Sequence, residues 1–136
     1  MADATASLDK TGLDAAMAAP RTSQARPATA DVRAASADSL AAYAAFCRTA
    51  LVAPAQSASW VRHWIAETRP DAVVATLEAG GRPVLALALE IERWGPFRIA
   101  RFMGGRHANG NFAAADPTWL GEVDCEAVQT LFDAIA

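Results

Sequence analysis

The sequence predicts an α/β (α+β) domain in which an antiparallel-rich sheet is flanked by helices. Apolar residues recur at every third or fourth position between residues 38 and 68, which is the period of a helix. Between residues 72 and 103 they recur at every second position, which is the period of a strand. Turns at residues 80–81 and 95–96 divide this second stretch into three strands. Connections this short make neighbouring strands antiparallel.

Length and composition limit the classes of function. A chain of 136 residues with 53% hydrophobic residues fits one domain with an ordinary core. The formal net charge of -3 gives no overall attraction to nucleic acid or to anionic lipid. No stretch approaches the ~20 apolar residues of a membrane helix, and the amino terminus lacks the pattern of a signal peptide. We therefore expect a cytoplasmic protein with no nucleic-acid partner and no membrane insertion.

Two regions are expected along the chain. Residues 1–37 are rich in Ala, Thr and Ser and have no aromatic residue, so we expect a disordered Ala-rich tail. Residues 38–136 are expected to form the folded part. The first helix is expected to begin at Ser36 or Asp38 and to end at Pro54. A second helix is expected to begin at Ser57 or Ser59. Its two tryptophans, Trp60 and Trp64, are expected to lie on one buried face.

The long predicted strand, residues 83–94, has one bulky face and one small face. The bulky face carries Leu85, Leu87, Leu89 and Ile91, and the other carries Val84, Ala86, Ala88 and Glu90. We expect the helix with two tryptophans and the last helix to cover the bulky face. That last helix is predicted after Pro117, with one apolar side: Val123, Val128, Leu131, Phe132 and Ile135. Its apolar stripe reaches Ala136 without a cap, so we expect a following segment that belongs to the same domain.

The loop from residue 104 to residue 112 is the most unusual segment. Its three glycines permit positive φ, and four polar side chains supply hydrogen-bond donors and acceptors: Arg106, His107, Asn109 and Asn111. Such a loop can bind a polar ligand, or it can be an ordinary turn whose side chains bond to their own backbone. It is not a GxGxxG motif and it lacks the lysine of a P-loop.

Charge is unevenly distributed around this loop. Residues 93–115 include four arginines and no acid, whereas residues 116–136 include five acids and no base. Either an anionic ligand or ion pairs between the strand arginines and the last helix would explain this. Glu90 and Glu92 share one strand face, where they are either paired carboxylates or the point at which the strand emerges into solvent.

Other catalytic patterns are weak. His63 and His107 have no HxxxH or HExxH spacing, and Cys47 and Cys125 have no metal-ligand spacing, so no metal site is expected. Both cysteines are expected to be buried free thiols. No GxSxG motif marks a nucleophilic serine.

Three segments together resemble the amino-terminal half of the GNAT-superfamily acyltransferases of the CelD type, bacterial proteins linked by name to cellulose biosynthesis. The family has a Gln-Ser-x-x-Trp helix, a strand of pattern G-x-P-x-x-x-x-P-L and a Phe-x-Gly-Gly-x-His-x-Asn loop, in that order. The strand departs from the pattern, because Ala88 stands where proline is expected. The helix and loop motifs match at Gln56, Ser57, Trp60, Phe102, Gly104, Gly105, His107 and Asn109.

The resemblance covers about residues 36–136 and implies a GNAT-like sheet with flanking helices, incomplete in this chain. It also implies a longer parent protein that transfers an acetyl or other acyl group from acetyl-CoA or another acyl-CoA to an amine or hydroxyl, such as a small molecule or a polysaccharide precursor. Such proteins hold the coenzyme pyrophosphate at a helix start through a glycine-containing turn, and this sequence has no such turn. The coenzyme is therefore not expected to bind this chain alone, and the missing carboxy-terminal half is the expected partner.

On the same resemblance, the loop residues Arg106, His107, Asn109 and Asn111 are expected to shape the acceptor side of a cleft, with no catalytic residue assigned. Two alternatives stay open. The chain is a non-catalytic binding or interaction module whose last helix docks on a partner, or it is a truncated inactive fragment.

Overall fold

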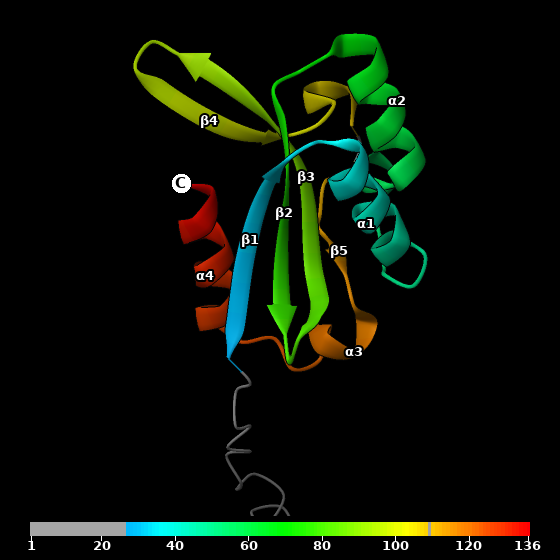
Figure 1. Cartoon of the computed structure of the whole chain (residues 1–136), viewed down its shortest axis with the longest axis vertical. Helices are drawn as coiled ribbons and strands as arrows, with labels where there is room; N and C mark the ends of the chain where they lie inside the picture. Colours follow the sequence, from blue (N-terminus) through cyan, green and yellow to red (C-terminus); the bar gives the residue numbers. More distant parts are fainter. Residues whose placement is uncertain (1–26, 109) are drawn as a thin grey trace, which may run out of the picture.

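The computed structural model describes residues 27–108 and 110–136. Within these ranges a five-stranded antiparallel sheet has the order β1-β2-β3-β4, and the short strand β5 also pairs with β3 (Figure 1). The mixed α+β class expected from the sequence is confirmed. The strands are β1 (Ala28–Ala34), β2 (Ala72–Ala79), β3 (Arg82–Trp94), β4 (Phe97–Phe102) and β5 (Ala114–Ala115). The α-helices are α1 (Ala37–Cys47), α2 (Ala58–Thr68), α3 (Pro117–Leu120) and α4 (Cys125–Ile135), and the 3₁₀ turns are η3 (Pro54–Gln56) and η4 (Gly105–His107).

Local signals set the helix starts. The side chain of Ser36 accepts from the backbone N–H of Ser39, whose own side chain accepts from the N–H of Ser36, so a capping box begins α1. Ser57 caps α2 in the same way, through the N–H of Trp60. Helix α1 ends at Cys47, earlier than the expected stop at Pro54, which instead begins η3.

Strand β1 lies inside the segment expected to be a disordered tail. Residues 28–34 pair along their full length with β2, so the expectation of disorder is wrong there, and residues 1–26 lie outside the described part. The alternation of Ala30 and Val32 with Asp31 and Arg33 fits an edge strand with one apolar face.

The helices form two layers on opposite faces of the sheet (Figure 1). Helix α4 packs against the bulky face, where Leu87, Leu89 and Leu131 are buried together. Helices α1 and α2 pack against the small face, which includes Ala86 and Ala88. The expectation that the tryptophan helix covers the bulky face is therefore wrong. Small side chains instead allow α1 and α2 to approach the sheet closely, and α4, together with Trp119 of α3, covers the leucines.

The predicted last helix is two helices. A turn after Leu120 separates α3 from α4, and Val123, expected on the buried side, is exposed in this connection. Phe132 is exposed as well, whereas Leu131 is buried and Ile135 partly so. None of the helices in the described ranges has the length and apolar character needed to cross a bilayer.

One side chain fills a gap in the sheet. On the outer edge of β3, Ala86 pairs with β5 and Glu90 pairs with β4, which leaves the backbone of Ala88 between them without a strand partner. The fully buried carboxamide of Gln56 occupies this position. Its Nε2 donates to the carbonyl of Ala88 (3.1 Å), and its Oε1 accepts from the N–H of Ala88 (2.9 Å). Gln56 therefore bonds to β3 as a neighbouring strand residue would.

The same glutamine connects β3 to α1. The hydroxyl of Tyr43 donates to the carbonyl of Gln56 (2.6 Å) and lies 3.2 Å from its Oε1. Burial raises the pKa of Tyr43 strongly, so this hydroxyl stays a neutral donor. Burial also raises the pKa of the neighbouring Cys47 thiol. Both cysteines are free, as expected, but Cys47 is only partly buried and Cys125 is exposed, so the expectation that both are buried is wrong.

Gln56→Ala is expected to destabilise the protein by about 2 to 4 kcal/mol, because it leaves the N–H and C=O of Ala88 buried without partners. Chemical denaturation measures this loss. Gln129→Ala, at an exposed position on α4, is the control and is expected to change stability by less than about 0.5 kcal/mol. Equal stability of the two variants would contradict the bridging role.

Candidate functional site

The loop after β4 folds back onto α2. Gly104 has φ 88°, a left-handed conformation that favours glycine, and begins the turn η4. A Cβ at Gly104 would lie 3.2 Å from Cζ2 of Trp60 and 3.2 Å from Cβ of Ala108. The loop thus lies directly against the first tryptophan of α2, which stacks on Trp64 with ring centroids 6.0 Å apart.

A shallow hollow of about 560 Å³ lies beside this contact. Helix α2, the outer half of β3, the end of β4 next to the sheet and the turn η4 all contribute to its wall. It combines an aromatic ring, two carboxylates, a guanidinium and an imidazole with two glycine backbones. The lining residues are Trp64, Glu90, Glu92, Arg101, Gly104, Gly105 and His107.

Both carboxylates of the hollow have partners. Trp64 Nε1 donates to Glu90 Oε2 (3.1 Å), which joins α2 to β3. Arg101 Nη1 lies 3.1 Å from Glu92 Oε2, a diagonal ion pair between β4 and β3. Glu90 and Glu92 do lie in one site, but each is held by a different partner, so they are not a mutually paired acid and base.

The predicted site residues differ in where they lie relative to the hollow. His107 lines the hollow and is exposed. The backbone of Arg106 lies within η4, and Asn109 lies outside the described residues. Asn111 does not line the hollow. Its Oδ1 is buried, and no donor bonds to it among the described residues.

The sequence reasoning missed Trp64 and Arg101 as parts of the site. Trp64 had been assigned only to a buried helix face, and the pairing of Arg101 with Glu92 depends on the register of β3 and β4. Of the two explanations given for the uneven charge, the ion pairs between the strand arginines and the last helix are not found in the part of the chain that the structure describes. Arg101 pairs within the sheet instead.

The starts of α3 and α4 already carry a negative charge of their own. Aspartates occupy the starts of the two carboxy-terminal helices: Asp116 accepts from the N–H groups of Thr118 and Trp119, and Asp124 accepts from that of Glu126. These hydrogen bonds lower the pKa of Asp116, so a negative charge stays where a phosphate would bind. The glycines at 104–105 lead only into a three-residue 3₁₀ turn.

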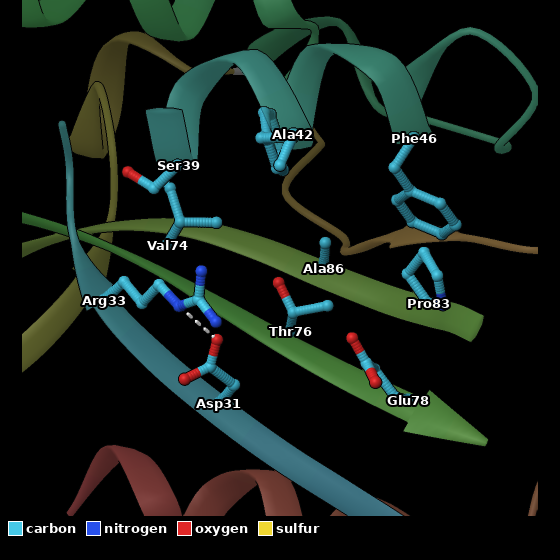
Figure 2. A pocket seen from close by; sticks show the side chains of 11 residues that line it. Asp31, Arg33, Ser39, Ala42, Phe46, Val74, Thr76, Glu78, Pro83 and Ala86 are labelled. Carbon is cyan, nitrogen blue, oxygen red and sulfur yellow. Dashed lines mark ion pairs between the residues drawn. The ribbon is translucent and has the colours of Figure 1, made fainter. Parts of the chain in front are cut away.

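A second, smaller cavity of about 130 Å³ lies between α1 and the sheet. Figure 2 shows Ser39, Ala42 and Phe46 on the helix side. On the strand side, Asp31 and Arg33 form an ion pair with each other at 2.6 Å. Because these two charges neutralise one another, the cavity offers no excess charge from this pair to a ligand.

The described residues contain no cluster of three or more His, Cys, Asp or Glu side chains suited to a metal ion. Comparison of the chain with protein-family models, with curated proteins and with solved structures gives no match.

Gly104→Ala is expected to destabilise the protein by about 2 to 4 kcal/mol, because it combines a left-handed backbone with a close approach to Trp60. Gly105→Ala is the matched control. Gly105 also has positive φ (44°), but a Cβ there meets nothing within 4 Å, so a loss of only about 1 to 2 kcal/mol is expected. Thermal or chemical unfolding compares the two, and equal losses would contradict the packing of the loop on Trp60.

Proposed function

We propose that this chain forms the acceptor-binding part of a GNAT-type acyltransferase, which transfers an acyl group from acetyl-CoA or another acyl-CoA to an amine or hydroxyl. A link to cellulose or other polysaccharide biosynthesis belongs to the same proposal and rests on the CelD-type resemblance. Under this proposal the coenzyme is bound by a further segment or chain, because the sequence has no glycine-containing coenzyme turn and aspartates occupy the starts of α3 and α4.

The observation that supports this proposal is that the three segments with family resemblance contact one another. Gln56, from the helix motif, bonds to the strand motif at Ala88. Trp60, from the same helix motif, packs against Gly104 of the loop motif. Residues more than thirty positions apart in the chain thus surround one region, as expected when the motifs serve a common site.

The departure at Ala88 also has a physical consequence. A proline at this position has no N–H, so the hydrogen bond from Ala88 to Gln56 Oε1 would be lost. In this chain the alanine and the glutamine form two hydrogen bonds in place of one.

The charges of the hollow favour an amine acceptor over a neutral hydroxyl. Two carboxylates and one guanidinium give a formal charge of -1 among the described lining residues, with histidine neutral. An ammonium group is attracted to Glu90 and to the ring of Trp64. The chain's own task is to bind and orient this amine.

Amine binding can be followed through the indole N–H of Trp64 by NMR. Glucosamine and spermidine are expected to shift this signal in a saturable manner, and Glu90→Gln is expected to weaken the binding at least about tenfold, because it removes one carboxylate from the hollow. Glu67→Gln, on the exposed side of α2, is the control and leaves binding unchanged. Acetyl-CoA is expected not to bind this chain alone.

Two results would contradict this proposal. Calorimetry that shows saturable micromolar binding of acetyl-CoA to this chain would contradict the assignment of coenzyme binding to another segment. An unshifted Trp64 signal with every amine would remove the acceptor role and favour the alternative of a non-catalytic interaction module or an inactive fragment.

A further inference from the structure

The β3–β4 hairpin extends beyond the rest of the sheet as an arm (Figure 1). Near its tip, Trp94 and Phe97 lie opposite one another in register, and 76% and 67% of their surfaces are exposed. Residues directly opposite in an antiparallel pair point to the same face. The arm therefore presents a pair of large aromatic rings to the surroundings, at a position where nothing in the described chain covers them.

The other face of the arm is basic. Arg93 and Arg98 are also directly opposite one another, and like charges in this arrangement repel. Neither arginine takes part in an ion pair within the described ranges, in contrast to Arg101 nearer the hollow. Such a tip is aromatic on one face and positively charged on the other, and it fits an acidic partner with exposed apolar groups.

The chain itself carries a surface of this kind on α4. Its outward side includes Phe132, which is 55% exposed, with the exposed acids Glu126 and Asp133. Gln129 Nε2 donates to Asp133 Oδ1 (2.7 Å), which holds this carboxylate on the outward side. Residues 116–136 contain five acids and no lysine or arginine, so nothing local neutralises them except at Asp116, which pairs with Arg82 at 3.8 Å.

We propose that the arm of one copy docks on α4 of a second copy of this chain. The basic face of the arm and the acidic outward side of α4 are different patches with opposite charge. Large apolar side chains are exposed on both elements: Trp94 and Phe97 on the other face of the arm, and Phe132 on the helix. Both elements lie on the left side of the molecule in Figure 1. Two copies related by a two-fold axis then exchange arms, and the assembly closes as a dimer.

Sedimentation velocity of the full chain over a concentration series tests this directly. The wild type is expected to dimerise with a dissociation constant of about micromolar. Trp94→Ala combined with Phe97→Ala is expected to be monomeric at the same concentrations. Leu51→Ala, which removes an exposed apolar side chain outside both patches, is the matched control and keeps the dimer. Circular dichroism verifies that each variant stays folded.

A charge exchange identifies the surfaces. Arg93→Glu with Arg98→Glu makes the arm acidic, and Glu126→Arg with Asp133→Arg makes the helix basic. Each double variant is expected to be monomeric alone, because its arm and helix then repel. An equimolar mixture of the two is expected to form a heterodimer, because both contacts are complementary again.

Three outcomes would overturn the proposal. These are a monomeric wild type at every concentration, double variants that each still dimerise, or a mixture that stays monomeric. In the first case, co-sedimentation of the wild type, but not of the Trp94→Ala and Phe97→Ala variant, with phosphatidylserine vesicles would assign the arm to an anionic lipid surface instead.

Discussion

The architecture depends on one side chain that replaces a strand residue. Strand β3 has two short partners on its outer edge, β5 and β4, and the backbone of Ala88 lies between them. The carboxamide of Gln56 satisfies the N–H and the C=O of Ala88, and the hydroxyl of Tyr43 on α1 donates to the backbone carbonyl of Gln56. Without it, a buried N–H and a buried C=O would each cost about 1 to 3 kcal/mol. The hydrogen bonds of Gln56 also fix the start of α2, which follows it directly in the chain.

The hollow follows from this arrangement. Because η3 is held against β3, α2 lies beside the point where β3 extends beyond the rest of the sheet. Trp64 can therefore donate to Glu90. The first tryptophan of the helix then supports Gly104, and the loop turns His107 toward the same space. The aromatic wall, the carboxylates and the loop thus come from three segments that are distant in sequence. The three segments are positioned relative to the contact between Gln56 and Ala88.

Local signals in the sequence predicted much of this fold. Ser36 and Ser57 begin helices because they satisfy backbone N–H groups in their own vicinity, and glycine turns define the β2–β3 and β3–β4 hairpins. Strand β1 was missed because its alternation, of Ala30 and Val32 with Asp31 and Arg33, lacks the large apolar residues that usually mark strands. The choice of sheet face by each helix depends on the path of the whole chain, which periodicity does not contain. The site was predicted in part for the same reason: His107 belongs to a conspicuous loop, whereas the bond from Trp64 to Glu90 spans 26 positions.

Amide hydrogen exchange at Ala88 tests the central role of Gln56 most directly. If its N–H is bonded to Gln56 inside the core, it exchanges only when the whole domain unfolds, with a free energy of opening equal to the global free energy of unfolding. Native-state exchange followed by NMR measures this value against denaturant. Exchange of Ala88 through local opening, at a rate like that of amides in the exposed tip of the β3–β4 arm, would contradict the account.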